Sequence, residues 1–455
     1  MIICLFDSWS SRNGGGMEYR VVQTNGAKEI IDFRRDPIAY LSDISGRGLD
    51  IKHVSVGNHH RYFLNNPDLI REVLVLNGKD FTKGSGVRSL EALLGQGLVT
   101  SEGALHSQQR KLIQPVFGPG KLSGYVNSIG YAAFAMQEKW ISGSTVVLEE
   151  DIRRLTIEII CRCMLGVEWK TNNTSALLAK ALGGFQALHG DKAHISSLPF
   201  KVLAKWKFDA FRRNLDLILK EIVKLHQMRP ECYSDMLSIL LSTADGREWT
   251  RHDESLLLDE ARTMLLAGHE NTTNALLWTW FLIAEHPEVR QAIREESNSQ
   301  IGSKLPGDID LRRFRFTESV FKEALRLYPP AWIFARQAVT NCKLGPLAIP
   351  AGSTVFLSPF SVHRDIRFWD RPLEFRPQRW LQPGDAIRTP FSYFPFGAGT
   401  RGCIGEQFAM MEGVLILATI SKNWVFDLAP GQQVELWPQV TLRQKKPLRF
   451  VALRV

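Results

Sequence analysis

Long hydrophobic runs are scarce in this sequence. The apolar runs from Met1 to Phe6 and from Ala275 to Ala284 both fall short of the roughly 20 apolar residues that a membrane-spanning helix needs. The first run is also too short for the core of a secretory signal peptide. The sequence therefore predicts a protein without a membrane anchor that resides in the cytoplasm.

Cysteine is sparse as well. The six cysteines do not follow the spacing of a disulfide-rich or zinc-binding protein. Cys161 and Cys163 lie in the apolar segment from Asp151 to Leu165, where we expect them to be buried structural thiols. Cys403, by contrast, has unusual surroundings.

Internal repeats, low-complexity tracts and linker-like segments are absent too. With 455 residues, of which 44% are hydrophobic, the chain can bury a large core. We expect one large, mainly α-helical domain over residues 31–455, and residues 1–30 are left without an assignment. The small β region is predicted to contain a hairpin over Ile51 to Val56 and His60 to Phe63, then a helix from Pro67 to Leu76, and strands within Gln433 to Val455.

The formal net charge is +9. No nucleic-acid-binding module accompanies the basic residues, so we expect no nucleic-acid partner. The sequence also lacks a Gly-x-Gly-x-x-Gly motif that opens a βαβ unit, so we expect no nicotinamide or flavin domain and an external source of electrons.

The segment FGAGTRGCIG, residues 396–405, precedes a helix-like run from Glu406 to Ile420. A cysteine at the start of a helix is favoured as the thiolate by the helix dipole and by free backbone amides. Gly402 and Gly405 allow a sharp turn and a close approach to a flat ligand, and Phe396 can shield the sulfur from water. The pattern indicates a thiolate ligand for a buried metal centre.

This segment matches Phe-x-x-Gly-x-Arg-x-Cys-x-Gly at every fixed position, and the sequence resembles the cytochrome P450 family of heme-thiolate monooxygenases, in a soluble bacterial form. The resemblance implies the cytochrome P450 fold and heme b (iron protoporphyrin IX), with Cys403 as the iron ligand. It also implies insertion of one oxygen atom from O2 into a hydrophobic small molecule. Electrons would come from a ferredoxin or flavodoxin-type donor with its NAD(P)H reductase, and we expect a monomer.

Heme carries two propionates, and buried anions need cationic or hydrogen-bonding partners. The segment around His106 and Arg110 resembles the family's propionate-binding helix, and a spacing of four residues puts both on one helical face. Arg336 and Arg401 match the remaining arginine positions of the family. We therefore expect these four residues to bind the propionates.

Glu323 and Arg326 lie one turn apart in an amphipathic segment from Phe316 to Tyr328, where a surface salt bridge would be the ordinary interpretation. In the family a second arginine joins this pair in a buried triad, and Arg379 occupies its place. The family's usual glutamate beside it is Gln378 here. Because a buried charge that loses its partner is costly, we expect the triad to be required for heme incorporation.

A long helix is predicted from about Asp253 to Glu285, and its centre is rich in small and polar residues. In the family this segment passes over the distal face of the heme, where Ala267 would leave space and a loosened helical turn admits dioxygen and water. Glu270 matches the family's acid. The next position, usually a threonine, is Asn271, and Thr272 comes one residue later, about a hundred degrees around the helix.

Several interpretations of the site remain open. The Asn271 amide organises the water that delivers protons past Glu270, or it makes an internal hydrogen bond to a helix carbonyl. Alternatively, the enzyme runs a peroxide-driven or redox-neutral reaction. An alternative of another class is a heme carrier or sensor, which would keep Cys403 but not need Glu270.

Apolar segments suggest a hydrophobic substrate, although core packing explains any single one equally well. The segments expected to contact the substrate are Phe81 to Leu98, Phe185 to Phe200, Leu265 to Ala267, Ala331 to Phe334 and Gln439 to Leu442.

Overall fold

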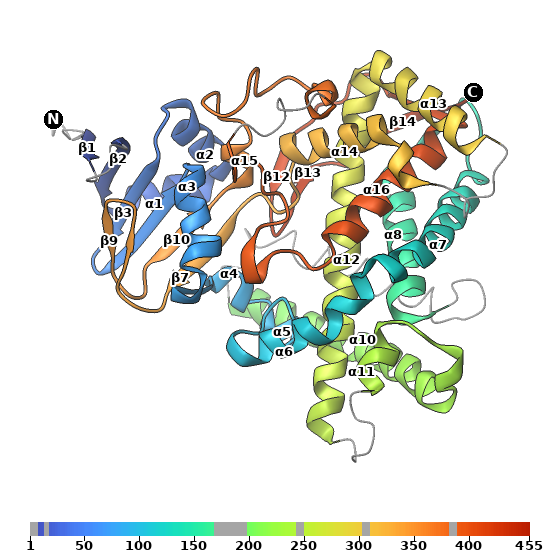
Figure 1. Cartoon of the computed structure of the whole chain (residues 1–455), viewed down its shortest axis with the longest axis horizontal. Helices are drawn as coiled ribbons and strands as arrows, with labels where there is room; N and C mark the ends of the chain where they lie inside the picture. The colour runs from blue at the N-terminus through green and yellow to red at the C-terminus, as the bar shows by residue number, and fades with distance from the viewer. Residues whose placement is uncertain (1–7, 13–17, 168–197, 243–249, 303–309, 382–388) are drawn as a thin grey trace. The chain divides into compact units, whose positions relative to one another are not determined.

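The computed structural model describes residues 8–12, 18–167, 198–242, 250–302, 310–381 and 389–455 (Figure 1). Of the segments expected to contact the substrate, most of Phe185 to Phe200 lies outside these residues. The chain forms two compact units. Unit 1 comprises residues 1–89, 318–403 and 440–443, and unit 2 comprises residues 90–317, 404–439 and 444–455.

Unit 1 is built on a seven-stranded sheet with the strand order β1-β2-β3-β4-β10-β7-β5. The predicted hairpin is confirmed, because β3 and β4 pair antiparallel with Ile51 opposite Leu64. Strand β10 pairs parallel with β4 and antiparallel with β7, so segments far apart in sequence lie side by side as blue and orange ribbons in Figure 1. The strands are β1 (Ser8–Arg12), β2 (Glu18–Asn25), β3 (Ile51–Val56), β4 (His59–Leu64), β5 (Phe81–Lys83), β7 (Phe334–Ala338) and β10 (Thr354–Leu357).

The core of unit 1 forms where this sheet packs against the segment after β4. That segment starts as α3 (Pro67–Arg71), whose first turn is capped by the Asn66 side chain, and it continues as one π-helical turn, η1 (Glu72–Leu76). The predicted helix is therefore present, with a wider second half. The other elements of unit 1 are α1 (Ala27–Arg35), α2 (Pro37–Gly46), η2 (Gly78–Asp80), α4 (Ser85–Arg88), β8 (Cys342–Leu344), β9 (Leu347–Ile349), α15 (Pro359–Val362), η7 (Pro377–Trp380) and η8 (Gly399–Arg401).

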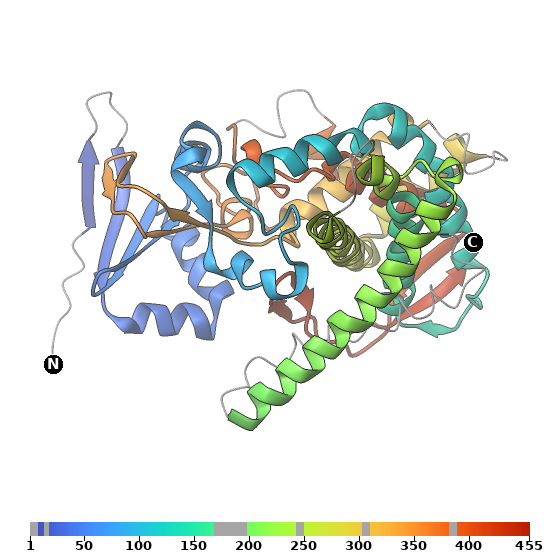
Figure 2. The ribbon, with the colours of Figure 1, turned by 90° about the horizontal axis from the view of Figure 1, so that it is seen from below.

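Unit 2 is organised around the long helix α12 (Arg251–Glu285), which stands upright in Figure 1 and is seen end-on in Figure 2. It packs against α8 (Leu148–Leu165), α10 (Leu198–Met228), α11 (Met236–Ser242) and α16 (Glu406–Ser421). Because neighbours surround it, most of its side chains are buried. Thr250 and Asp253 form a reciprocal capping box at its start, and the predicted helix is confirmed.

The mainly helical fold expected from the sequence is confirmed. Unit 2 also contains a three-stranded sheet with the order β11-β14-β6. No helix among the described residues has the length and apolar character needed to cross a membrane. Further elements of the chain are α5 (Glu91–Leu94), α6 (Gly103–Ile113), η3 (Gln114–Phe117), α7 (Pro119–Gln137), β6 (Thr145–Val146), η4 (Pro230–Cys232), α13 (Pro287–Ile301), η6 (Leu311–Arg313), α14 (Arg315–Leu327), β11 (Trp424–Leu428), β12 (Leu436–Pro438), β13 (Leu442–Gln444) and β14 (Phe450–Arg454).

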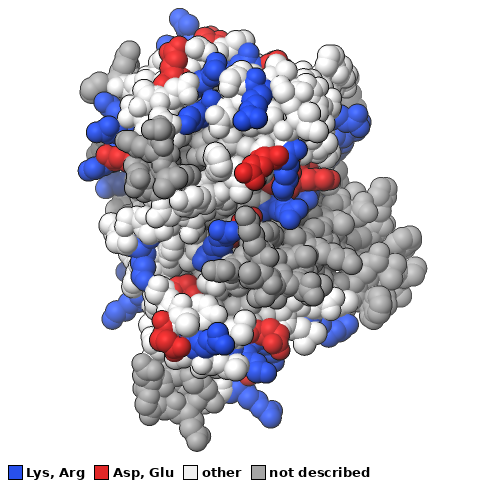
Figure 3. All heavy atoms as spheres, turned by 90° about the vertical axis from the view of Figure 1, so that its right-hand side faces the viewer, with Lys and Arg blue, Asp and Glu red and all other residues white. Residues whose placement is uncertain are grey.

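Basic and acidic side chains are interspersed among uncharged atoms on the face drawn in Figure 3. No continuous basic stripe crosses the described part of this face. Such mixing is typical of a solvated surface.

Candidate functional site

The residues that the sequence predicts at the heme are divided between the two units. Unit 1 holds Arg336, Phe396, Arg401 and Cys403. Unit 2 holds His106, Arg110, Ala267, Glu270, Asn271 and Thr272.

Cys403 ends a tight loop in unit 1. Its backbone N–H donates to the Phe396 carbonyl at 2.9 Å, which holds these two residues together. Gly397 and Gly399 have φ angles of 69° and 68°, in the left-handed region that favours glycine. A Cβ on Gly399 would also lie 2.0 Å from the carbonyl oxygen of Leu74. The loop therefore needs glycine at both positions.

Gly402 and Gly405 have φ angles of −62° and −93°, which any residue can adopt. The chain does bend at Gly402 and turn at Gly405, as the sequence pattern indicated, but the left-handed conformations of the loop lie at the two earlier glycines. A Cβ on Gly402 would lie 3.3 Å from backbone atoms of Ala398 and Gly399. Its small size therefore serves close packing inside the loop.

The Cys403 side chain is exposed and forms no disulfide. Cys161 and Cys163 are buried, and burial raises the pKa of both thiols, as expected for structural cysteines. Within the described ranges, no group of three or more His, Cys, Asp and Glu side chains is arranged to hold a metal ion. An accessible cysteine on a glycine-rich loop fits heme iron, because the porphyrin would supply ligands that the protein does not provide.

Two arginines of unit 1 are anchored by backbone carbonyls. Arg401 Nη1 donates to the Gly78 carbonyl at 2.9 Å. Arg336 is buried on β7, and its Nη1 donates to the Ala335 carbonyl at 3.1 Å. A guanidinium fixed in this way is suited to a carboxylate partner such as a heme propionate.

In unit 2, His106 and Arg110 lie on one face of α6, with the imidazole buried and the guanidinium half-buried. The helix is tied to the preceding loop by Gln109, whose Nε2 donates to the Gln96 carbonyl at 2.7 Å. This bond helps to fix the helix that carries the pair.

The centre of α12 is a regular α-helix. Asn271 Nδ2 donates to the Ala267 carbonyl at 3.2 Å, and the Thr272 hydroxyl donates to the Gly268 carbonyl at 3.3 Å. The loosened turn implied by the family resemblance is not present, because these side chains bond to carbonyls of an unbroken helix. The internal hydrogen bond considered for Asn271 is confirmed.

Residues at the centre of α12 differ in packing and in burial. A Cβ on Gly268 would lie 2.6 Å from Cδ1 of Ile160 on α8, so this glycine allows the two helices to approach closely. Ala267, Glu270 and Asn271 remain half-buried, whereas Thr272 is buried. The acid and the amide thus keep access to water.

Glu412 is a buried residue of α16 that sequence reasoning missed. Its side chain is fully buried, and among the described residues neither carboxyl oxygen has a hydrogen-bond partner at normal geometry. Burial raises the pKa of Glu412 well above its usual value, and the nearby Thr272 hydroxyl opposes this only in part. The available signal was a carboxylate inside the apolar run of residues 408–420.

We expect Glu412→Gln to change how stability depends on pH. The folded protein keeps a proton on Glu412 that the unfolded chain releases above its pKa of about 4.5. Stability therefore falls as pH rises from that value toward the raised pKa, by up to about 1.4 kcal/mol per pH unit. The variant should lose this slope in denaturant unfolding measured between pH 5 and pH 8. Exposed Glu295→Gln is the matched control, and a variant as pH-dependent as the parent would contradict the assignment.

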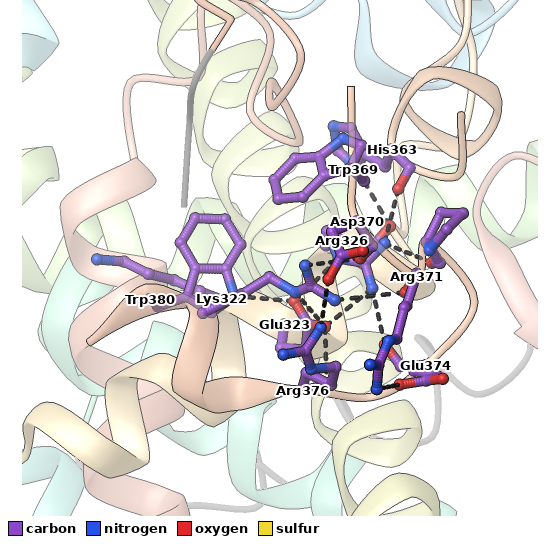
Figure 4. Close-up of polar contacts among 12 residues, drawn as sticks. Lys322, Glu323, Arg326, His363, Trp369, Asp370, Arg371, Glu374, Arg376 and Trp380 are labelled. Atoms are coloured by element: carbon purple, nitrogen blue, oxygen red, sulfur yellow. Dashed lines mark hydrogen bonds and ion pairs between the residues drawn. The ribbon is translucent and has the colours of Figure 1, made fainter. Parts of the chain in front are cut away.

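The predicted triad of Glu323, Arg326 and Arg379 is confirmed in unit 1. Figure 4 shows Glu323 and Arg326 with their polar partners. Helix α14 (Arg315–Leu327) carries the first two residues, whose side chains are completely buried. Glu323 Oε1 accepts hydrogen bonds from Arg326 Nη2 at 2.8 Å, Arg379 Nε at 3.0 Å and the Arg376 backbone N–H at 3.0 Å. Its Oε2 accepts from Arg326 Nε and Trp380 Nε1, both at 2.9 Å.

Arg326 uses its remaining donors on backbone carbonyls. Nη1 donates to His363 and Pro372, both at 2.7 Å, and Nη2 donates to Glu374 at 3.1 Å. Although burial alone would raise the pKa of Glu323, the hydrogen bonds and charges of Arg326 and Arg379 lower it. Glu323 and Arg326 together thus tie α14 to the segment from His363 to Trp380.

The cytochrome P450 family model matches residues 30–451. Cyclooctatin synthase of Streptomyces melanosporofaciens is 30% identical over 423 residues, which cover 92% of this chain and 91% of that protein. Pentalenene oxygenase of Streptomyces avermitilis is 28% identical over 424 residues, covering 91% and 92%. Cyclooctat-9-en-7-ol 5-monooxygenase of Streptomyces melanosporofaciens is 29% identical over 405 residues, covering 87% and 86%.

A solved structure extends this similarity to three dimensions. The crystal structure of CYP175A1 from Thermus thermophilus matches with a TM-score of 0.75 and 25% sequence identity. The match covers 94% of this chain and 99% of that one.

Proposed function

Because the chain belongs to the cytochrome P450 family and is therefore a heme-dependent oxidoreductase, we propose that it inserts one atom of O2 into a hydrophobic, terpene-like small molecule. The observation that carries this proposal is the exposed Cys403 on its glycine-turned loop. The substrate class is inferred from relatives named for oxygenation of pentalenene and of cyclooctat-9-en-7-ol. We propose one functional domain over residues 31–455, acting as a monomer in the cytoplasm.

In this proposal the thiolate of Cys403 binds the iron, and Phe396, whose carbonyl accepts from the Cys403 amide, excludes water from the sulfur. The propionates would be held by the guanidinium groups of Arg336 and Arg401 and by the side chains of His106 and Arg110. Heme supplies the one-electron and O2 chemistry when it is bound.

Proton delivery falls to the half-buried part of α12. The Asn271 amide nitrogen is held by the Ala267 carbonyl, so its Oδ1 is the atom that would accept a hydrogen bond from water. The Glu270 carboxylate, one residue earlier and also half-buried, exchanges protons with that water. The Thr272 hydroxyl donates to the Gly268 carbonyl and lies near Glu412. In this role it supports the part of α12 that carries Glu270 and Asn271.

We expect Asn271→Ala to lower product formation by about 100-fold if the amide organises proton delivery. More hydrogen peroxide should then be released per NAD(P)H consumed, whereas Asn271→Thr should retain most of the coupling. Thr279→Val is a matched control, because Thr279 makes the same kind of bond to a carbonyl of α12. Unchanged coupling in both Asn271 variants would remove this residue from the mechanism.

The electron donor provides the test of the proposed function. The enzyme with a ferredoxin or flavodoxin, its reductase and NAD(P)H should incorporate one atom of ¹⁸O2 into a terpene alcohol or hydrocarbon. Turnover driven by hydrogen peroxide alone, or without any donor, would favour the peroxide-driven or redox-neutral alternative. A protein that binds heme but oxidises nothing in a broad substrate screen would favour the carrier or sensor.

A further inference from the structure

The loop from Gly95 to Ser101 in unit 2 lies directly on α12. A Cβ on Gly95, whose φ is +61°, would lie 2.2 Å from the carboxyl group of Asp259. A Cβ on Gly97 would lie 2.1 Å from Oγ1 of Thr263. No side chain fits at these two positions, so the loop backbone approaches the helix closely.

Buried carboxylates of α12 hold the loop through its backbone. Asp259 Oδ2 accepts from the Gln96 N–H at 2.7 Å, and Glu260 Oε2 accepts from the Leu98 N–H at 3.1 Å. Hydrogen bonds to charged acceptors are stronger than those between neutral groups. A change in the position of the Asp259 carboxylate would therefore displace or loosen the loop.

Arg262 sets the position of that carboxylate. Its Nη2 pairs with Asp259, and its Nη1 pairs with Asp216 of α10. The side chains of Arg262 and Asp259 are 3% and 6% exposed, whereas that of Asp216 is 26% exposed, so two members of the chain are buried. We call Asp216, Arg262 and Asp259 the Arg262 bridge.

Helix α10 reaches the same segment by a second route. Arg212 of α10 donates from Nη1 to the Ala92 carbonyl of α5 at 2.7 Å, and its Nε lies 3.9 Å from Asp216 Oδ2. Figure 2 shows α10 as one long green helix beside the end-on α12. The segment from Glu91 to Leu98 is thus connected to both helices.

On its other side, the loop is connected to α6. Gln109 of α6 donates to the Gln96 carbonyl at 2.7 Å and accepts from the Ser101 hydroxyl at 2.6 Å. Gln96 therefore bonds α12 through its N–H and α6 through its carbonyl. Helix α6 carries His106 and Arg110.

We propose that Arg262 is a positioning residue that couples α10 to the loop from Gly95 to Ser101 and, through Gln96, to α6. Its guanidinium pairs with the Asp259 carboxylate and holds it aimed at the Gln96 N–H, so a displacement of α10 that pulls on Asp216 loosens the loop. The coupling rests on a continuous chain of ion pairs and hydrogen bonds, not on proximity alone. Its consequence for ligand binding, but not the coupling itself, rests on the proposed function.

Hydrogen–deuterium exchange tests the coupling on the heme-loaded protein. We expect Arg262→Met to raise exchange in the peptide spanning Gln96 and Leu98 by about tenfold or more, with a smaller rise at the start of α6. Asp216→Asn changes only the partly exposed end of the bridge and should raise the same exchange by about threefold. It keeps the test decisive if Arg262→Met does not fold. Arg262→Lys keeps the positive charge but lacks the planar guanidinium, so its exchange in this peptide should lie between that of Arg262→Met and that of the parent.

The matched control is a second ion pair between the same two helices. Lys220 of α10 and Glu254 of α12 lie 3.0 Å apart with about half of each side chain exposed, and their ion pair is separate from the Arg262 bridge. Lys220→Met should leave exchange at Gln96 and Leu98 unchanged. Exchange there within about twofold of the parent in Asp216→Asn and in any folded Arg262→Met overturns the proposal. A uniform rise over all of unit 2 overturns it too, because that would be general destabilisation.

Binding of 4-phenylimidazole, followed by heme absorbance, measures the consequence for the site. We expect Arg262→Met to raise the Kd by about tenfold at unchanged heme content, and Lys220→Met to leave it as in the parent. An unchanged Kd would show that the Arg262 bridge affects only the dynamics of the loop. That result would overturn the positioning role of Arg262. If the parent itself bound no heme, the proposed function would fail, while the exchange experiment on the apoprotein would still decide the coupling.

Discussion

Glu323→Ala should yield protein that retains no heme and whose free energy of unfolding is lower by about 3 to 5 kcal/mol. The reason is the number of partners that share one carboxylate. Arg326, Arg379, the Trp380 indole and the Arg376 amide all donate to Glu323, and none of it reaches solvent. Removing the carboxylate leaves two guanidinium groups buried or nearly buried without a counter-charge.

The measurement is the yield of heme-loaded protein together with the midpoint of denaturant unfolding. Glu318→Ala is the matched control, since Glu318 also lies on α14 and pairs with Lys322, but its side chain is 42% exposed. Surface pairs of this kind contribute about 0 to 1 kcal/mol. The heme content and unfolding midpoint of Glu323→Gln should fall between those of Glu323→Ala and Glu318→Ala, because glutamine keeps the shape of the side chain without its charge. A Glu323→Ala protein with the parent's heme content and midpoint would show that the triad is dispensable.

The triad also predicts the direction in which acid changes the stability of the fold. Because the folded protein holds the pKa of Glu323 below its value in the unfolded chain, the triad contributes its stability above the unfolded value of 4.5. That contribution is lost as pH falls through the lowered pKa. Glu412, whose pKa is raised, acts in the opposite direction over a higher pH range.

Cys403→Ala should abolish the red-shifted absorbance band that reduced, sulfur-ligated heme gives with carbon monoxide, and substrate oxidation should fall to background. The exposed Cys403 is the residue through which the chain would ligate iron, and a methyl group offers no ligand. Because the side chain is exposed and the loop is shaped by Gly397 and Gly399, folding itself should be little affected. Circular dichroism and thermal unfolding would verify this.

The control for this experiment is Cys232→Ser, which changes another exposed cysteine far along the chain in η4. It should keep both the band and the activity. A Cys403→Ala protein that retains the red-shifted band would show that another group ligates the iron, and the proposed function would then lose its foundation.

The sequence by itself determined the features that depend on local residue order. The loop of residues 396–405, the long helix α12 and the hairpin of β3 and β4 were all predictable, because turns, capping residues and hydrophobic periodicity act over a few neighbouring residues. The triad was predictable only through the family resemblance, since Glu323 and Arg379 are far apart in sequence.

The tertiary structure alone decided which side chains share a buried environment. Nothing near Glu412 in sequence indicates that Thr272 of another helix faces it, and nothing near Arg262 indicates Asp216 or the Gln96 amide. At Gly399 a distant contact, the Leu74 carbonyl, also excludes any side chain, whereas at Gly397 the positive φ favours glycine. Burial and charge pairing depend on all elements packed around a group, so a linear pattern cannot specify them.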